Sequence, residues 1–324
     1  MSVTPLGPGG EFDIIRGILD GANAARPPVA LAAGDDCALI ACADGYLALG
    51  CDLTVEGVHY LTGWGGDRRV GRRAVLAAIS DLAAMAANPL AVLVAINVPA
   101  GATVATMEAI GRGARDAAAE HGAALIGGDI SRGGAGIAID VTAVGEVTEP
   151  LLRSRARPGD ELFVTGRLGG AAAAVRAWKR DEAPREEWEG RFWDPRPRVA
   201  EALWLRARGV PAAIDLSDGL IADAGHLAAA SGVALEIDAD AVPADAGVDV
   251  ALAITGGEDY ELLAAAPPDI LGERDISEFE REFGTPLTRV GRAASGSGVR
   301  VFRGGEEVKV DTEGFDHFRL EAES

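Results

Sequence analysis

Residues 72–87 have the sequence RRAVLAAISDLAAMAA, in which, after two arginines, only Ser80 and Asp81 interrupt an apolar run. A helix that is apolar on nearly all faces is expected to be buried. Residues 91–98, AVLVAINV, follow Pro89 and are rich in β-branched side chains, which is typical of a buried strand. The two segments predict an α/β protein whose buried helix carries a carboxylate.

Asp81 needs a compensating partner in these surroundings. The residues four positions away are Ala77 and Met85, so no basic side chain is placed to pair with it along the helix. A carboxylate in an apolar environment carries a desolvation cost unless something offsets it. Solvent contact at a helix end is one alternative, but a bound metal ion is the simplest compensation, and we favour it.

Similar acidic motifs recur along the whole chain, and basic residues within them are few. Carboxylate oxygens are the ligands that hard cations prefer, so the set predicts a site where Mg²⁺ holds a polyphosphate. The motifs are Gly34-Asp35-Asp36, Asp52 with Glu56-Gly57-Val58-His59, Ser80-Asp81, Gly127-Gly128-Asp129, Asp215-Leu216-Ser217-Asp218-Gly219 and Gly256-Gly257-Glu258-Asp259.

Each motif also has a purely structural interpretation. Asp35 and Asp36 could form an ordinary Asx turn. Ser217 or Asp218 could cap a helix, which is compatible with binding phosphate at the same helix N-terminus. The two Gly-Gly pairs could be plain turns, although they would also let the backbone approach a phosphate closely. His59 could be structural or could contact a substrate phosphate.

Several familiar phosphate-binding signatures are absent from the sequence. It has no G-x-x-x-x-G-K-[ST] and no G-x-G-x-x-G, and the protein-kinase motifs are missing. Metal ions and arginines must therefore manage phosphate charge. Arg153 is the best arginine candidate, and Arg132, Arg155 and Arg157 are weaker ones.

Composition limits the class of protein. The 324 residues are enough for two domains with sizeable cores. Apolar residues make up 48% of the chain but aromatic residues only 5%, so close packing of Ala- and Gly-rich helices must supply much of the core. The formal net charge of −20 argues against a nucleic-acid-binding protein, which needs a basic surface.

The cysteines and the apolar segments indicate the cellular compartment of the protein. Cys37, Cys42 and Cys51 are odd in number and lack a C-x-x-C spacing, which argues against a disulfide framework or a zinc site. We expect buried or partly buried free thiols in a reducing cytosol. Residues 1–13 show no signal peptide, and 89–99 is too short to cross a bilayer. The sequence predicts a soluble, cytoplasmic protein with no membrane partner.

Hydrophobic patterns and turn signals predict alternating strands and helices, with a domain boundary near Glu149-Pro150. Residues 181–197 are charged and contain several prolines, so we expect a surface excursion there. The expected strands are 46–52, 91–98, 123–126, 136–147, 162–165, 212–214, 234–237 and 260–264, with a hairpin of 299–303 and 307–310. The expected helices are 72–87, 103–121 with Thr103 as N-cap, one from Gly169-Gly170, and 218–231.

These motifs, in this order, resemble those of the thiamine-monophosphate kinase family in the AIR-synthase-like (PurM-like) superfamily. The resemblance runs from residues 10–12 to 314–318, essentially the whole chain. The most specific stretches are GDDCA at 34–38, VEGVH at 55–59, SDLAAM at 80–85, AIDLSDGL at 213–220 and GGEDYEL at 256–262.

The resemblance implies a two-domain α/β PurM-like fold. Residues 1–149 would form an N-terminal β-sheet domain that dimerises and binds ATP and Mg²⁺. Residues 150–324 would form a C-terminal α/β domain that binds substrate and metal, with ATP in the cleft. The implied activity is direct transfer of the ATP γ-phosphoryl group to thiamine monophosphate, which gives thiamine diphosphate without a covalent enzyme intermediate.

The resemblance also implies roles for individual residues, carried over at matching positions. Several Mg²⁺ ions would be held by Asp36, Asp52, Asp81, Asp129, Asp215 and Asp218. ATP would be contacted by Gly128, Asp129, Arg153 and Ser217, and thiamine monophosphate by His59, Glu258 and Phe315. The partners that the resemblance implies are ATP, thiamine monophosphate and a second copy of the chain.

The sequence departs from the family pattern at a few positions. Cys51 replaces Ser or Thr before Asp52, Ala78 replaces Asn, Ile130 replaces Thr, and Tyr60 replaces Phe. Two alternatives therefore stay open. One is another PurM-like ATP-dependent enzyme of the selenophosphate synthetase, AIR synthase or hydrogenase-maturation type. The other is a non-catalytic nucleotide sensor.

Overall fold

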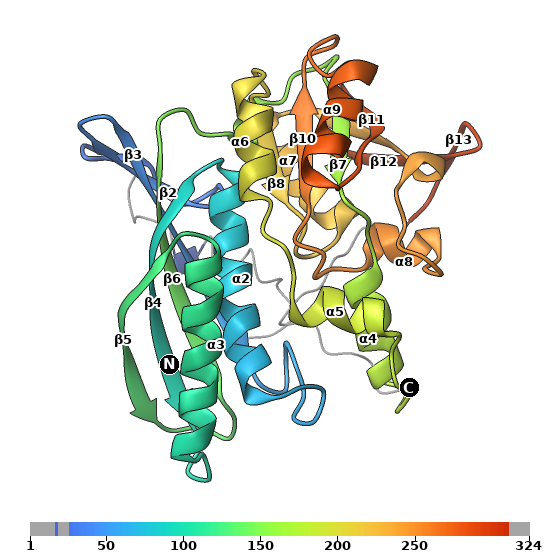
Figure 1. Cartoon of the computed structure of the whole chain (residues 1–324). Helices are drawn as coiled ribbons and strands as arrows, with labels where there is room; N and C mark the ends of the chain where they lie inside the picture. Colours follow the sequence, from blue (N-terminus) through green and yellow to red (C-terminus); the bar gives the residue numbers. More distant parts are fainter. Residues whose placement is uncertain (1–16, 19–25, 311–324) are drawn as a thin grey trace, which may run out of the picture.

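Two β-sheets organise the chain (Figure 1). The computed structural model describes residues 17–18 and 26–310, and within them one sheet has six strands and the other seven. Helices pack on both sheets, which is the two-domain α/β architecture that the sequence predicted.

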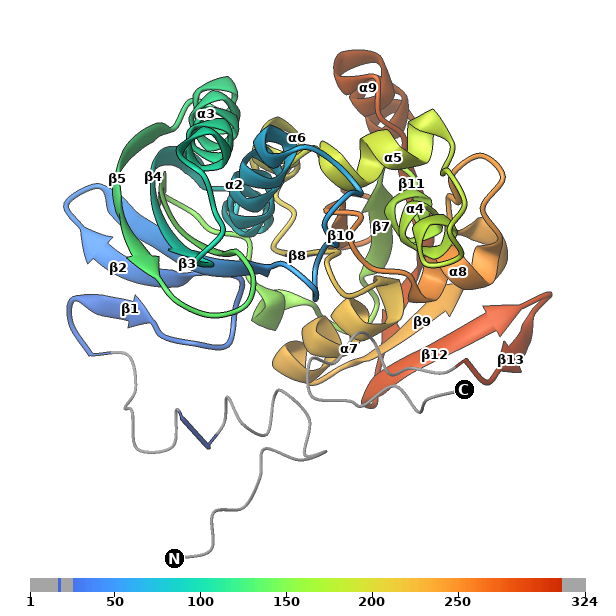
Figure 2. The same ribbon diagram turned by 90° about the horizontal axis from the view of Figure 1, so that it is seen from below.

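The first sheet has the strand order β1-β2-β3-β6-β4-β5. Neighbouring strands are antiparallel except β4 and β5, which are parallel. Helices α2 and α3 lie side by side over one face (Figure 2). The elements are β1 (Val29–Leu31), β2 (Ala38–Cys42), β3 (Gly45–Val55), α2 (Asp67–Ala84), β4 (Asn88–Val98), α3 (Val104–Glu120), β5 (Ala124–Arg132) and β6 (Ala138–Val147).

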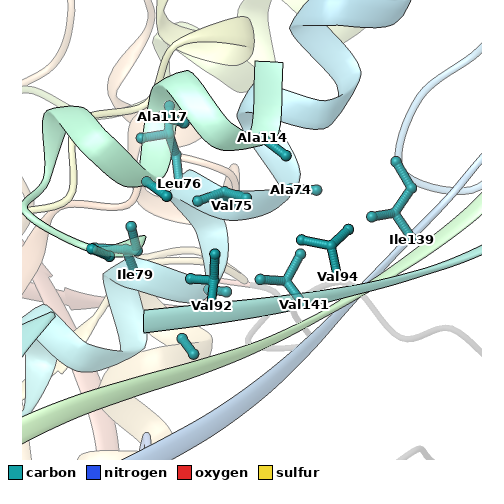
Figure 3. Close-up of a cluster of buried hydrophobic side chains, with 14 of the residues drawn as sticks. Ala74, Val75, Leu76, Ile79, Val92, Val94, Ala114, Ala117, Ile139 and Val141 are labelled. Carbon is teal, nitrogen blue, oxygen red and sulfur yellow. The ribbon is translucent and has the colours of Figure 1, made fainter. Parts of the chain in front are cut away.

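The core of this domain lies between α2, α3 and the sheet (Figure 3). On β6, Ile139 and Val141 alternate with less buried residues, as expected for a strand with one covered face. Small residues let the two helices approach closely, since a Cβ at Gly113 would lie 1.9 Å from the Arg68 carbonyl oxygen. The low aromatic content is thus matched by close helix packing.

The second sheet has the strand order β13-β12-β9-β11-β7-β10-β8. Its last two strands form the expected hairpin. The strands are β7 (Glu161–Thr165), β8 (Ala212–Asp215), β9 (Ala234–Asp238), β10 (Leu262–Ala266), β11 (Leu287–Ala294), β12 (Gly298–Arg303) and β13 (Glu306–Val308). The helices are α4 (Gly170–Trp178), α5 (Glu186–Trp193), α6 (Val199–Ala207), α7 (Leu220–Ser231), α8 (Val250–Thr255) and α9 (Glu273–Phe283), with short 3₁₀ turns at Arg153–Arg155 and Ala239–Ala241.

Helix α2 lies at the junction of the two domains. One side packs on α3 and the first sheet, and the helix also contacts α5, α6 and β8 of the second domain (Figure 1). The prediction that residues 72–87 form a buried helix is confirmed in essence, because all but the first turn of α2 is largely buried. This position makes α2 the element that can carry side chains to both domains.

Two segment predictions are wrong. We expected a strand over 123–126 that ends before Gly127-Gly128-Asp129, but β5 continues through the motif to Arg132. Gly128 allows this, since a Cβ there would lie 1.8 Å from the Val94 carbonyl oxygen of β4. Residues 181–197 are not a simple surface excursion, because they contain α5, whose Phe192 and Trp193 are buried in the first core.

Smaller expectations have mixed outcomes. Thr103 caps α3 by accepting the Thr106 N–H at 3.1 Å, as predicted. The three thiols are free, but Cys42 and Cys51 are exposed, so the expectation of burial holds only for Cys37. Among the helices of the described residues, none combines the length and apolar character needed to cross a membrane.

Candidate metal and substrate site

Three of the predicted metal ligands meet at the domain junction. Asp36 comes from the loop before β2, Asp81 from α2 and Asp215 from the end of β8. One carboxylate oxygen from each lies within 4.8 Å of those of the other two. Segments far apart in the sequence, from both domains, thus bring three acidic side chains to one point. We call these three residues the acidic cluster.

Local packing fixes two members of the acidic cluster. Ser80 Oγ donates a hydrogen bond of 2.7 Å to Asp215 Oδ2, so neighbouring residues of α2 supply one cluster member and hold another. Gly50 of β3 leaves room for Asp81, since a Cβ there would lie 3.2 Å from Asp81 Oδ2 and 3.3 Å from Cys37 Sγ. Close approach of helix and strand at this point therefore depends on a small residue on β3.

The acidic cluster resists full ionisation. Burial, then the charge of Asp36, raises the pKa of Asp215 to about 8. Burial, then the charges of Asp215 and Asp52, raises the pKa of Asp81 well above its usual range. Asp52 lies two residues after Gly50 on β3 and therefore on the same face of the sheet as the glycine that contacts Asp81. Burial and Asp36 together raise the pKa of Asp35 to about 7. A divalent cation would stabilise the ionised forms, and three hard carboxylate donors fit Mg²⁺.

Arg153 brings a positively charged side chain to the acidic cluster. Its Nε and Nη2 donate to the two carboxylate oxygens of Asp36 at 3.1 and 2.7 Å. Its backbone N–H donates to Asp35 Oδ2 at 3.1 Å, which gives Asp35 a structural role beyond an Asx turn. Its carbonyl oxygen accepts a 2.5 Å bond from Ser231 Oγ. Arg153, predicted to contact ATP, is thus held against the acidic cluster.

The loop before α7 carries Asp218 beside this cluster. Capping of α7 by Ser217 or Asp218 was the structural alternative, and it is wrong, because the N-cap is Gly219 and makes no side-chain cap bond. Instead, buried Asp223 accepts the backbone N–H groups of Asp218 at 3.1 Å and Gly219 at 3.0 Å. One ligand atom each of Asp218, Asp223 and His226 lies within 4.8 Å of the others.

The two adjacent acidic residues of the Gly256-Gly257-Glu258-Asp259 segment make different contacts. Asp259 is turned inward and accepts the Gly169 N–H at the start of α4, at 2.8 and 2.9 Å. The Glu258 carboxylate accepts a bond of 3.0 Å from the Tyr260 hydroxyl and pairs with Arg73 of α2. The backbone N–H of Glu258 donates to the Ser217 carbonyl at 2.7 Å, which ties this segment to the Asp218 loop.

The remaining predicted substrate residues have different outcomes. His59 Nδ1 accepts the Val55 N–H at 2.9 Å, so a neutral imidazole carries its proton on Nε2. This tautomer can donate to a phosphate oxygen. Phe315 lies outside the described residues.

Asp129 is a predicted ligand that lies away from the acidic cluster within one chain. It pairs with Ala95 of β4, which pairs with Asp140 of β6, which in turn pairs with Leu53 of β3. Residues paired in this way share a face of the sheet, and successive residues alternate faces. Asp52 therefore lies on the opposite face from Asp129, and β6 and β4 lie between their two strands.

Comparison with known proteins shows the family to which the chain belongs. The family models "AIR synthase related protein, N-terminal domain" and "AIR synthase related protein, C-terminal domain" match residues 34–147 and 157–304, one on each sheet. The thiamine-monophosphate kinase of Salmonella typhimurium is 33% identical over 95% of this chain and 98% of its own. The chain belongs to the thiamine-monophosphate kinase family.

Solved structures from the thiamine-monophosphate kinase family share the fold. The structure described as "AaThiL complexed with AMPPCP and TMP" has a TM-score of 0.83 and 30% identity, and the match covers 98% of this chain and 99% of that one. Thiamine-monophosphate kinase from Stenotrophomonas maltophilia K279a has a TM-score of 0.75 and 37% identity, with 91% and 96% covered.

Sequence reasoning missed several residues around the acidic cluster and the Glu258 segment. Gly50 was overlooked because a single glycine in a strand has no local signature. Asp223 gave a usable signal, an acid five residues after Asp218 at the start of an apolar helix. Arg73 gave a weaker one, since it lies seven residues before Ser80 and so on the same face of α2.

Proposed function

We propose that the protein transfers the γ-phosphoryl group of ATP to thiamine monophosphate and forms thiamine diphosphate and ADP. The observation that carries the proposal is the acidic cluster at the domain junction, in a chain that matches thiamine-monophosphate kinases over nearly its full length. A related structure holds AMPPCP, an ATP analogue, together with TMP. Both substrates carry phosphates, which a carboxylate-rich site can bind only through cations.

In this proposal the protein would hold Mg²⁺ ions and both substrates, and the ions, when bound, would supply the positive charge that neutralises and aligns the phosphates. The metal ligands are Asp36, Asp52, Asp81, Asp215 and Asp218, with Asp129 supplied as described below. Ser217 and Gly128 contact ATP, and Arg153 adds positive charge beside Asp36. His59 donates from Nε2 to the phosphate of thiamine monophosphate, and Glu258 and Phe315 contact the rest of that substrate. Direct transfer between aligned phosphates requires no protein nucleophile.

We further propose that a second copy of the chain completes the site with its Gly128 and Asp129. Among the described residues, strand β5 is one edge of its sheet and is exposed throughout, so this edge can pair with another strand. Large apolar side chains are exposed on β5 and on β3 and β4 of the same sheet, an arrangement typical of a contact surface. They are Leu53, Leu93, Leu125, Ile126 and Ile130.

The two domains then have separate roles in a homodimer. Residues 1–149 supply the dimer contact and part of the ATP and Mg²⁺ site, and residues 150–324 supply the rest of the metal site and most contacts to thiamine monophosphate. The free thiols fit a reducing compartment, and we assign the protein to the cytoplasm.

The test is a direct assay. Purified protein is incubated with ATP, Mg²⁺ and thiamine monophosphate, and the thiamine phosphates and adenine nucleotides are resolved by chromatography. We expect equimolar thiamine diphosphate and ADP, no product when EDTA removes Mg²⁺, and no phosphorylation of free thiamine offered in parallel. Folded protein that binds ATP but forms no thiamine diphosphate would overturn the proposal.

A further inference from the structure

Arg73 is a buried arginine that reaches from one domain to the other. It lies on α2, and its side chain is 3% exposed. Its guanidinium donates one N–H to the Phe192 carbonyl oxygen and another to Glu258 Oε2. It also stacks over the Phe192 ring, 4.1 Å from the ring centre. A buried guanidinium is stable only when its donors are used, so these contacts fix where it points.

The partner of Arg73 belongs to a strained segment. Glu258 and Tyr260 have φ values of 74° and 50°, the left-handed region that non-glycine residues rarely adopt. Such conformations persist where surrounding contacts enforce them. The backbone N–H groups of both residues donate to carbonyls of the Asp215–Asp218 segment, Glu258 to Ser217 and Tyr260 to Leu216, at 2.7 and 2.8 Å. The side chain of Glu258 makes a separate contact, with Arg73 of the other domain.

The two oxygens of the Glu258 carboxylate have different surroundings. Arg73 and the Tyr260 hydroxyl both donate to Oε2. Within the described part of the chain Oε1 accepts no hydrogen bond, and the side chain is 24% exposed. The carboxylate is therefore held by one oxygen while the other remains available to a ligand donor or cation.

Helix α2 connects this contact to the acidic cluster. Arg73 and Ser80 are seven residues apart, two helical turns along one face of α2. Ser80 holds Asp215 of the acidic cluster, and Arg73 holds Glu258. One rigid element thus holds two carboxylates, Asp215 and Glu258, from attachment points about 10 Å apart along the helix axis.

We propose that Arg73 is a positioning residue for thiamine monophosphate, which acts by orienting Glu258 so that Oε1 contacts the cationic thiazolium or the exocyclic amine of the substrate. The inference rests on the proposed function. It assigns to Arg73 a role in acceptor binding, separate from the binding of ATP at the acidic cluster.

The test compares Arg73→Met and Arg73→Lys with wild type in steady-state kinetics for both substrates. We expect Arg73→Met to raise KM for thiamine monophosphate about 10- to 100-fold and to change KM for ATP less than about two-fold. Arg73→Lys keeps the charge but cannot donate hydrogen bonds to Phe192 and Glu258 together. Its KM for thiamine monophosphate should therefore lie between those of wild type and Arg73→Met. Arg72→Met is the matched control, because Arg72 pairs with Glu120 and Asp194 on the same helix.

A double-mutant cycle separates positioning from a general structural effect. If Arg73 acts through Glu258, then Arg73→Met in a Glu258→Gln background should change KM for thiamine monophosphate less than about three-fold further. Additive effects, or equal rises in both KM values, would overturn the inference. If Arg73→Met does not fold, Arg73→Lys and the Glu258→Gln cycle decide.

A crystallographic readout keeps the inference distinct from the proposed function. A wild type that makes no thiamine diphosphate refutes the function, and the contact is then judged by the structures of wild type and Arg73→Lys. We expect the Glu258 carboxylate to keep its orientation in the first and to change it in the second. An unchanged orientation would overturn the inference whatever the activity.

Discussion

The acidic cluster and segment 127–129 both contain aspartates that the sequence predicts to bind metal, but the first is at the domain junction and the second is in an exposed strand. Asp36, Asp81 and Asp215 come from both domains and meet at a buried point. Segment 127–129 lies in an exposed edge strand, with Asp129 on the other face of the sheet from Asp52. Within one chain the first set meets at one point, and Asp129 of the second lies on another face of the sheet.

The difference shows that a motif's chemistry and its location are set by separate features. Asp81 is placed by a helix that is apolar on most faces, so its burial follows from its own neighbours. The placement of Asp129 depends on strand order and on the alternation of side chains across the sheet. If Asp129 takes part in catalysis, it does so on a second copy, and the following experiments test each half of that comparison.

The largest effect is expected at the acidic cluster. Asp81→Asn removes a charge from the cluster and should lower kcat by about 10²- to 10³-fold, because the phosphates lose a metal contact. The metal-free protein should be no less stable, since the pKa of Asp81 is raised by burial and by Asp215. Turnover assays and thermal unfolding with and without Mg²⁺ measure both. Asp67→Asn, at the exposed start of the same helix, is the control, and near-normal turnover in Asp81→Asn would contradict the site assignment.

A heterodimer tests whether Asp129 acts on the other chain. Asp81→Ala and Asp129→Ala subunits, each inactive alone, are co-expressed with different tags and purified as the mixed dimer. If the site is shared, one of its two sites is intact and about half of the wild-type activity returns. The mixed dimer of Asp81→Ala with Asp215→Ala should stay inactive, because both residues serve the same chain's cluster. No recovery in the first mixture would place Asp129 outside the site.

Much of the fold and of the acidic cluster could be predicted from sequence. Residues 72–87 are apolar enough to force burial, and Asp215 follows a short apolar strand, so local pattern alone placed both. The family resemblance then supplied the idea that distant motifs share one site. The structure shows that this holds for Asp36, Asp81 and Asp215.

The failures share a physical cause, which is that tertiary pairing overrides local signals. Segment 127–129 looks like a turn, but parallel pairing with β4 extends the strand through it. Residues 181–197 look like a surface segment because many of them are charged. The same segment nevertheless carries Phe192 and Trp193, whose side chains are buried. Arg72 and Arg73 are adjacent and the sequence does not distinguish them. They point in different directions around α2, so Arg72 is partly exposed and Arg73 is buried.

The pH dependence should differ with and without Mg²⁺. The folded-state pKa of Asp215 is about 8, against about 3.9 when unfolded, so the protonated form stabilises the folded state. That stabilisation is complete below about pH 4 and is lost as pH rises towards 8. The metal-free protein should therefore unfold at lower temperature at pH 8 than at pH 6. Mg²⁺ competes with these protons, so the rise in Tm that it causes should be larger at pH 8.

Two controls make this pH prediction specific. Asp215→Asn cannot titrate, so its metal-free Tm should vary less between pH 6 and pH 8 than that of wild type. Calorimetry in buffers of different ionisation enthalpy should show protons released when Mg²⁺ binds, and fewer at pH 8 than at pH 6. Mg²⁺ binding with no proton release at pH 6 would mean that the acidic cluster is not where the ion binds.

The smallest effect is expected from Gly50→Ala, which tests how closely the acidic cluster depends on its packing. The new methyl group would lie 3.2 Å from Asp81 Oδ2 and 3.3 Å from Cys37 Sγ, so Asp81 must shift by a few tenths of an ångström. We expect Mg²⁺ affinity to fall about three- to ten-fold, with a change in unfolding free energy of at most about 1 kcal/mol. Gly111→Ala on α3, where a Cβ meets no atom within 4 Å, should leave Mg²⁺ binding unchanged. If the Gly50 variant binds Mg²⁺ as wild type does, the metal tolerates movement of Asp81, and the buried site is less rigid than its packing implies.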